Sequence, residues 1–162
     1  MKRLRLVVIA VLVLGLAALG GHLYHQYAIP PEQKIRNVME DLRAGIQTGS
    51  TGKVMANFSD KYWDGTNTKM DLRRIALQVL QSSDQYGVVI QDVQLQPMEP
   101  GAATAQAHIL ADIWMKQGLS ETASWHFELD AAFAHSWKGW KITSLTGWQA
   151  TVDKAAGDQG GL

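Results

Sequence analysis

Two histidines and three carboxylates recur an even number of residues apart in the middle of this sequence, a pattern that could bind a metal ion. They are His108, Asp112, His126, Glu128 and Asp130. In extended strands these side chains would share one face, because successive residues point to opposite sides. Imidazoles and carboxylates on adjacent strands can hold zinc or a similar ion. No dense ligand motif accompanies them, so we predict no metal site and no cofactor, and interpret this face as outward-facing.

The same face carries two large apolar side chains. Leu110 and Trp114 alternate with the carboxylates and would lie near His126. Apolar patches on a surface tend to mark interfaces. We therefore predict that Leu110, Trp114 and His126 form a partner face, for a homodimer or for another protein.

Several kinds of chemistry have little support. The chain contains no Cys, which excludes disulfides, thiolate metal sites and a Cys nucleophile. Acid–base catalysis needs a group within hydrogen-bond reach of the substrate, and the inward faces of the two central strands carry no ionisable residue. We therefore assign no catalytic residue, and the sequence favours a protein that is not an enzyme.

The charge balance excludes a further class of partner. Three of the 15 Lys and Arg are Lys2, Arg3 and Arg5, so the rest of the chain carries 12 against 15 Asp and Glu, a net of −3. A mildly acidic domain without a basic stripe is unsuited to nucleic acid, where phosphate neutralisation supplies most of the affinity.

The elements that position these residues are four strands with period-two alternation. They are expected at Gly87–Gln96, Ala102–Lys116, Thr122–His135 and Trp140–Gln149, joined by turns at Pro97–Gly101, Gln117–Leu119 and Ser136–Gly139. In the last of these turns, Trp137 beside Lys138 is expected to be exposed, where it could touch a membrane interface or a partner.

A three-residue loop at Gln117–Leu119 would bring the apolar faces of the two central strands together. It would place Ala111 opposite Trp125 and Ile109 opposite Phe127 on the inner face. On the outer face it would place His108 opposite Glu128.

Three helices are expected before the strands. Pro31 suits a first helical turn, and apolar residues then recur at helical spacing from Ile35 to Ile46. Ser50 or Thr51 could cap a short second helix. Thr68 and Asp71 form a capping box for a third, which carries an apolar stripe of its own at Leu72, Ile75, Ala76, Val79 and Leu80. Helices followed by a strand meander predict an α+β fold, with the helices packed in the concave face of a curved four-stranded antiparallel sheet.

The N-terminus predicts a membrane segment. Lys2, Arg3 and Arg5 precede Leu6–Gly21, which has no polar side chain. Small residues at Ala18 and Gly20 would also suit a signal peptide cleaved after Gly20. The positive charges place the N-terminus in the cytoplasm. We expect a single-pass inner-membrane protein with a periplasmic domain, or a periplasmic protein if the segment is cleaved. The expected organisation is residues 1–29 as transmembrane signal anchor, 30–150 as domain and 151–162 as disordered tail.

The order of elements and several local sequences resemble the nuclear transport factor 2-like superfamily, including its SnoaL-like branch with the cystatin-like α+β cone. The matching stretches are Phe58-Ser59-Asp60-Lys61-Tyr62-Trp63-Asp64-Gly65, Asp71-Leu72-Arg73-Arg74, Ala105, and Trp140-Lys141-Ile142-Thr143-Ser144-Leu145-Thr146-Gly147-Trp148. The resemblance covers Pro31–Gln149. It implies a bent sheet wrapped around a long helix, with a pocket at the open end. Candidates to line that pocket are Tyr62, Trp63, Ile109, Trp125, Phe127, Trp140 and Trp148.

The superfamily contains enzymes, ligand binders and assembly modules, so the fold does not fix the function. We expect a membrane-anchored, non-catalytic binding or assembly module of the bacterial envelope, which uses either an apolar pocket for a small hydrophobic ligand or the convex face for a partner. The alternative is a SnoaL- or ketosteroid isomerase-like enzyme acting on a small hydrophobic substrate, with Tyr62, Asp64 or Asp92 in the pocket. A third possibility is a structural protein whose core is filled and has no pocket.

Overall fold

The computed structural model describes residues 29–81, 85–99, 101–117 and 120–148. The chain divides into two compact units, Met1–Lys34 and Ile35–Leu162. We call the second unit the domain. The expected anchor over residues 1–29 lies outside the described residues except for Ile29, and so does the expected tail over 151–162. Within the described ranges, no helix combines the length and apolarity needed to cross a membrane.

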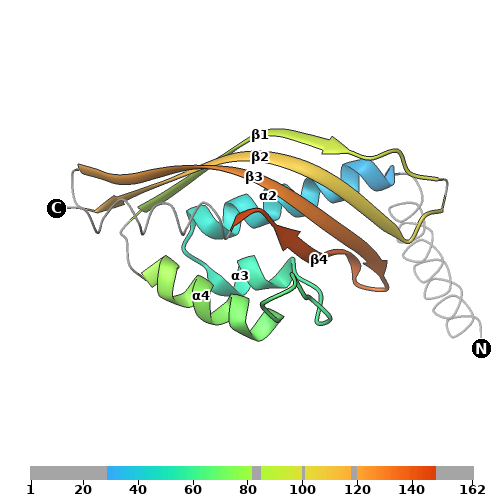
Figure 1. Cartoon of the computed structure of the whole chain (residues 1–162), viewed down its shortest axis with the longest axis horizontal. Helices are drawn as coiled ribbons and strands as arrows, with labels where there is room; N and C mark the ends of the chain where they lie inside the picture. The colour runs from blue at the N-terminus through green and yellow to red at the C-terminus, as the bar shows by residue number, and fades with distance from the viewer. Residues whose placement is uncertain (1–28, 82–84, 100, 118–119, 149–162) are drawn as a thin grey trace, which may run out of the picture. The chain divides into compact units, whose positions relative to one another are not determined.

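The described chain forms an α+β fold, as the sequence predicts (Figure 1). Its helices are α2 (Pro31–Gln47), α3 (Thr51–Ala56) and α4 (Lys69–Gln81). Its strands are β1 (Gln85–Leu95), β2 (Thr104–Gln117), β3 (Ser120–Ser136) and β4 (Gly139–Thr146). They form one antiparallel sheet in the order β1-β2-β3-β4. The sheet curves over α2, and the helices lie on one side of it (Figure 1).

The helix starts follow local capping chemistry. Ser50 accepts a hydrogen bond from the Lys53 backbone N–H and caps α3. The backbone N–H of Thr68 donates to Asp71 Oδ2 at 3.1 Å, and the Asp71 N–H donates to Thr68 Oγ1 at 3.4 Å. These reciprocal bonds are the predicted capping box, and they satisfy amides that the first turn of α4 leaves without partners.

The apolar stripe of α2 supplies one side of the core. Ile35, Val38, Met39 and Leu42 are buried against alternating residues of the sheet. The sheet contributes small residues beside large ones, which lets α2 lie close to the strands without leaving voids. The buried members from the four strands are Val93, Ala105, Ala107, Ile109, Ala111, Phe127, Leu129, Ala131, Phe133, Trp140 and Ile142.

Helix α4 is less buried than its apolar stripe suggests. None of its residues is fully buried, although Leu72, Ala76 and Leu80 pack against the core. Val79, which the sequence assigns to the apolar stripe, is 47% exposed. The reason is that α2 already fills the concave face, so α4 packs against α3 and covers only the margin of the core.

The pairing of β2 with β3 is shifted by two residues from the expected register. Ala111 lies opposite Phe127 and Ile109 lies opposite Leu129, so the expected partners Trp125 and Phe127 are wrong. The inward and outward facing of these residues is unaffected, because a shift of two residues preserves the alternation.

A shorter connection and a β-bulge, each worth one residue, together explain the shift. The two strands extend to Gln117 and Ser120, so their connection is residues 118–119 and not the expected three-residue loop. The register changes between Met115 and Lys116, and this bulge supplies the odd residue that keeps the apolar faces together. Two further bulges, between Ile90 and Asp92 and between Ala132 and Phe133, occur in the other strand pairs. Bulges increase local bending and twist, which accounts for the curvature of this sheet.

Other parts of the domain bond to backbone groups at both edges of the sheet, through a short backbone pairing at β4 and through side chains of α2 at β1. At β4, the Ile142 N–H donates to Asn57 O at 2.9 Å and the Ser59 N–H donates to Ile142 O at 2.8 Å. At β1, the Arg36 guanidinium donates to Val93 O and the Gln47 amide donates to Val88 O. These bonds use backbone groups that an open edge would offer to another strand.

Candidate functional site

Two cross-strand His–Asp pairs lie on the outer face of the sheet. His126 Nδ1 is 2.7 Å from Asp112 Oδ1, and His108 Nδ1 is 3.0 Å from Asp130 Oδ1. The Gln91 amide also donates to Asp112. Each imidazole therefore has a carboxylate partner on the neighbouring strand.

The expected pairing of His108 with Glu128 is wrong, because the register places His108 opposite Asp130. Glu128 instead lies opposite Leu110. The five His and carboxylate side chains consequently form two separate pairs and an isolated Glu128. Within the described residues no three His, Asp or Glu side chains are grouped closely enough to hold a metal ion.

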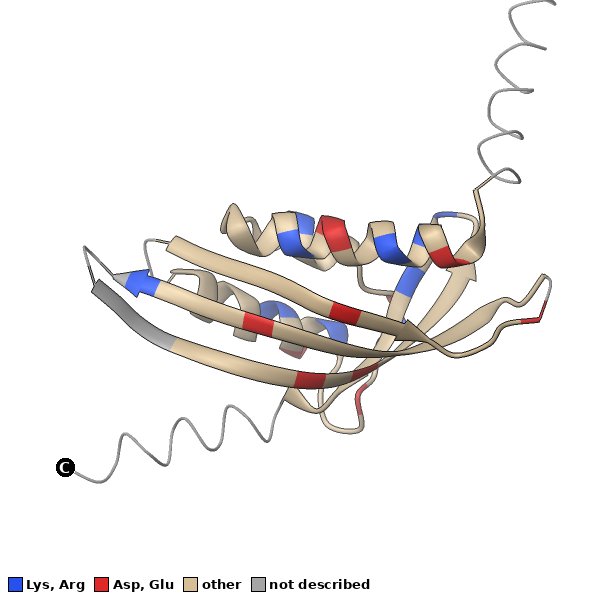
Figure 2. Ribbon diagram, turned by 90° about the horizontal axis from the view of Figure 1, so that it is seen from above, with Lys and Arg blue, Asp and Glu red and all other residues tan. Residues whose placement is uncertain are grey.

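The outer face is acidic. Asp92, Asp112, Glu128 and Asp130 project from three neighbouring strands, and Lys116 is the cation that shares their face among the described side chains of those strands. Figure 2 shows acidic residues spaced along the strands. This surface therefore suits a partner with complementary positive charge better than an anionic one.

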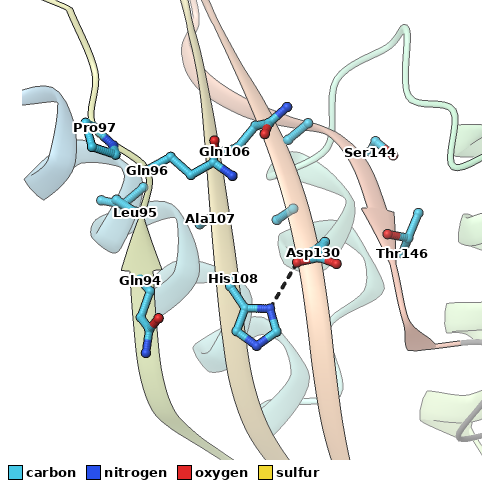
Figure 3. Close-up of a pocket in the computed structure, with 12 residues that line it drawn as sticks. Gln94, Leu95, Gln96, Pro97, Gln106, Ala107, His108, Asp130, Ser144 and Thr146 are labelled. Atoms are coloured by element: carbon cyan, nitrogen blue, oxygen red, sulfur yellow. Dashed lines mark hydrogen bonds and ion pairs between the residues drawn. The ribbon is translucent and has the colours of Figure 1, made fainter.

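The outer face also contains a hollow with a volume of about 720 Å³ (Figure 3). All four strands contribute to it, and its lining is largely amide, hydroxyl and imidazole groups. The residues that line it are Gln94, Leu95, Gln96, Pro97, Gln106, Ala107, His108, Asp130, Ala131, Ala132, Ser144 and Thr146. A second hollow, of about 570 Å³, shares Gln96, Pro97, Gln106 and Ala132 with the first and extends toward the connection between β1 and β2. This region was not predicted from the sequence. The signal that could have indicated it is the alternation of Gln, Ser and Thr at outward-facing positions of the strands.

The expected partner-face residues all project from the outer face. His126 is exposed, while Leu110 and Trp114 are half-buried. The burial of Trp114 has a local cause: a Cβ on Gly87 would lie 1.9 Å from the Trp114 ring, so this indole lies directly over the glycine. Lys116 Nζ is 5.4 Å from the centre of the same ring.

The outer face also presents an apolar residue that sequence reasoning missed. Val89 is 53% exposed and lies opposite Asp112. The run Val88-Val89-Ile90 is continuously apolar, so alternation could not show which member faces outward.

The expected pocket-lining residues lie elsewhere. Tyr62, Ile109, Phe127 and Trp140 are buried members of the core, and Trp125 and Trp148 are partly buried against it. Trp63 is 53% exposed. None of the seven lines either of the two hollows.

Tyr62 and Asp64 form a buried polar pair beneath β4. The Tyr62 hydroxyl donates to Asp64 Oδ2 at 3.0 Å, and Leu145 O lies 3.4 Å away. Asp64 Oδ1 accepts the backbone N–H groups of Thr66 and Asn67, at 3.0 and 2.7 Å. This carboxylate is therefore saturated by the turn that contains it.

The ionisation of the pair fits a structural role. Burial by itself would raise the pKa of Asp64, but the hydrogen bonds from Asn67, Thr66 and Tyr62 outweigh burial and lower it. Burial, followed by the negative charge of Asp64, raises the pKa of Tyr62. At neutral pH the pair is thus an anionic carboxylate and a neutral phenol, with no proton available from the acid.

Asp92, the third candidate for the pocket acid of such an enzyme, is exposed on the outer face. It accepts a hydrogen bond from the Gln94 amide at 2.7 Å. It is therefore separated from Tyr62 and Asp64 by the sheet.

Comparison with known proteins supports the fold. No protein-family model and no curated protein matches the sequence. A nuclear transport factor 2-like superfamily protein from Salmonella enterica has a TM-score of 0.60 at 8% identity, covering 72% of this chain and 90% of that one. A candidate dehydratase of the same family from Streptomyces avermitilis has a TM-score of 0.58 at 11% identity, covering 70% and 91%. An NTF2-like protein of unknown function from Pseudomonas putida has a TM-score of 0.58 at 12% identity, covering 70% and 82%. The chain has the nuclear transport factor 2-like fold.

Proposed function

We propose that this protein is a membrane-anchored, non-catalytic binding or assembly module of the bacterial envelope, which binds its partner through the outer face of the sheet. Residues 1–29 would be the anchor, with the N-terminus in the cytoplasm and the domain in the periplasm. The alternative of cleavage after Gly20 would release the same domain into the periplasm.

The observation that carries the proposal is the position of the 720 Å³ hollow. It crosses the outer face of all four strands, on the side away from the helices. Its volume is within the range of sites that bind ligands or side chains of a partner. The His108–Asp130 pair lines the hollow, and Leu110 lies beside it on the same face. Farther along this face, Val89 and Trp114 provide apolar surface and His126–Asp112 a second polar pair.

The inner face offers less to a ligand. Its small side chains lie opposite large ones, as Ala111 does to Phe127, and the space between the sheet and α2 is occupied by core residues. An apolar ligand between sheet and helices would have to displace side chains that are already packed. The version of the module with an inner apolar pocket therefore has less support than the version with an outer binding face.

The enzymatic alternative rests on the fold and on the enzyme names of several structural neighbours, the candidate dehydratase among them. A SnoaL- or ketosteroid isomerase-like reaction needs an acid or a Tyr that reaches the substrate. The Asp64 carboxylate already accepts hydrogen bonds from Thr66, Asn67 and Tyr62. The Tyr62–Asp64 pair is therefore better explained as support for the turn between α3 and α4.

A charge substitution on the outer face tests the proposal. Leu110→Arg would place a cation at a half-buried position beside the hollow, and Leu77→Arg makes the same change on α4, where Leu77 is 39% exposed. Native mass spectrometry of the full-length protein, extracted gently from its own membrane, would report the bound species. We expect a complex with a second copy or another protein that Leu110→Arg removes and Leu77→Arg retains.

Two results would contradict the proposal. Loss of the complex in Leu77→Arg with retention in Leu110→Arg would place the interface on the helices. A monomer carrying a small hydrophobic molecule in every variant would favour the inner pocket. The intact mass also shows whether the chain begins at Met1 or after Gly20, and so tests the anchor separately.

A further inference from the structure

Trp137 is the most exposed large apolar side chain of the described residues. It lies in the turn between β3 and β4 and is 85% exposed. Ser136 shapes this turn, because its hydroxyl donates to Gly139 O and accepts the Lys138 N–H, each at 3.2 Å. The indole is therefore held away from the core by an ordered turn. Lys138 Nζ lies 5.0 Å from the centre of the ring.

Lys138 is one of three lysines whose charges interact at this end of the domain, together with Lys69 and Lys141. Lys141 Nζ donates to Ala56 O at 2.7 Å, and Lys69 Nζ donates to Phe58 O at 2.8 Å, so backbone carbonyls fix both side chains. Burial, followed by the positive charge of Lys69, lowers the pKa of Lys141, with a further contribution from Lys138. We call the group of Lys69, Trp137, Lys138 and Lys141 the basic tip.

Two carboxylates offset part of the charge of the basic tip. Asp60 forms an ion pair with Lys69 at 2.8 Å and also acts on Lys138 and Lys141, and Asp41 on α2 acts on Lys141. Three lysines against these two carboxylates leave one positive charge in excess. Glu99 belongs to the connection between β1 and β2, at the same end of the sheet but on the side of β1, at the opposite edge from β4. Positive charge and an exposed indole therefore coincide at the β4 side of this end.

The basic tip lies at the end of the domain where the chain enters it. Arg36, one residue after the domain begins, donates to Val93 O near the end of β1. In an antiparallel sheet ordered β1-β2-β3-β4, the turn between β3 and β4 is at the same end as the end of β1. Figure 1 shows that the part of α2 within the domain starts at the same end as this turn. A segment that precedes Ile35 therefore joins the domain at the end that carries Trp137.

We infer that the basic tip contacts the headgroup layer of an anionic lipid bilayer. This inference rests on the proposed anchoring, which would hold this end of the domain near the membrane. An indole suits the interface because its ring is apolar and its N–H is polar. Lysines near an anionic surface are attracted to its phosphates, by an amount that falls within a Debye length. The acidic outer face of the sheet would be repelled by the same surface, which leaves it accessible to a partner.

The natural fluorescence of the full-length chain tests the inference. All six Trp belong to the domain, at positions 63, 114, 125, 137, 140 and 148, so quenching by lipid reports on the domain and not on residues 1–29. The protein would be reconstituted into vesicles containing brominated phosphatidylcholine, with or without phosphatidylglycerol. We expect a quenched fraction of the emission in the vesicles with phosphatidylglycerol, and loss of most of that fraction in Trp137→Phe. Trp114→Phe, on the outer face, is the matched control and should retain it.

The charge contribution has its own variant. Lys138→Gln removes one cation from the exposed turn. In the anionic vesicles we expect the ratio of domains that touch the bilayer to domains that do not to fall roughly five-fold. A higher salt concentration should also lower the quenching of the wild-type protein, because salt screens the attraction between the lysines and the anionic lipid.

Flotation of the vesicles tests membrane anchoring separately from the contact between the basic tip and the bilayer. A protein that floats with the vesicles and shows no quenching, or that retains full quenching in Trp137→Phe, would overturn the inference and leave the anchoring intact. A protein that does not float with either kind of vesicle would overturn the anchoring and, with it, the contact of the basic tip.

Discussion

The inner and outer faces of the sheet are built from alternate residues of the same strands, yet they differ in composition and in contacts. Ile109 is fully buried, whereas its neighbour Leu110 is half-buried on a face shared with four carboxylates. Much of the inner face is buried beneath α2 and α3, although Ile113 and Trp125 are only partly buried. The outer face keeps a hollow, apolar side chains and paired polar groups in contact with solvent. This difference indicates that the inner face stabilises the fold and the outer face is available for binding.

The largest expected effect is at Ile109. Ile109→Ala should lower the free energy of unfolding by about 2–5 kcal/mol, because it removes buried methyl groups and leaves a cavity. The same truncation one residue along, Leu110→Ala, should have an effect of about 1 kcal/mol or less, since that side chain retains contact with water. Urea denaturation of both variants measures the contrast. Similar losses at the two positions would mean that the faces do not differ as described.

Gly87 tests how the outer face holds Trp114. Gly87→Ala should destabilise the domain by roughly 1–3 kcal/mol, because the new Cβ would overlap the indole that lies on it. In a Trp114→Ala background the same substitution should have almost no effect. A double-mutant cycle measured by thermal unfolding gives the coupling directly. Equal effects of Gly87→Ala in both backgrounds would show that the indole does not lie on this glycine.

The buried pair of Tyr62 and Asp64 should contribute more to stability than the exposed pairs of the outer face. Asp64→Asn removes a charge that hydrogen bonds from Asn67 and Thr66 stabilise, so we expect a loss of about 1–2 kcal/mol at neutral pH. The pKa of Asp64 is lowered below its ordinary value of 3.8 on folding. Its contribution is therefore present above about pH 3.8 and is lost as the pH falls through the lower folded value.

Unfolding free energies of the wild type and Asp64→Asn, measured from neutral to acidic pH, check both statements. The difference between the two proteins should shrink toward the acidic end. A difference that grows on acidification would show that folding raises the pKa of Asp64.

The smallest effect on stability is expected for the outer His–Asp pairs. His126 and Asp112 lie 2.7 Å apart, but the imidazole is 53% exposed, so water screens the interaction. His126→Ala should change the free energy of unfolding by less than about 1 kcal/mol. The same variant should weaken association, measured by sedimentation of the extracted full-length protein. A stable, normally associating His126→Ala protein would remove this residue from the binding face.

Much of the fold could be predicted because its signals are local. Pro31, the Ser50 cap and the box of Thr68 and Asp71 mark helix starts in the sequence, and period-two alternation marks β2 and β3. The facing of Leu110 and Trp114 follows from that alternation alone.

The register and the site could not be predicted, because they depend on features without a local signal. The shorter connection between β2 and β3 and the bulge after Met115 each moved the pairing by one residue, so His108 lies opposite Asp130 and not Glu128. The position of the hollow depends on how three bulges bend the whole sheet. Tyr62 can be buried in the core because its hydroxyl donates a hydrogen bond to Asp64, two residues away. This contact depends on the conformation of the turn, which has no simple sequence signal.

The central claim, that the outer face of the sheet is the binding surface, is tested most directly by site-specific cross-linking. The chain has no Cys, so one thiol at a chosen position gives a single attachment site for a photoactivatable maleimide. Val89→Cys places it on the outer face and Leu77→Cys on α4, at side chains 53% and 39% exposed. In membranes containing the full-length protein, we predict an adduct from Val89→Cys that disappears when Leu110→Arg is added, and none from Leu77→Cys. Adducts from Leu77→Cys alone, or adducts from Val89→Cys that Leu110→Arg leaves unchanged, would contradict the claim.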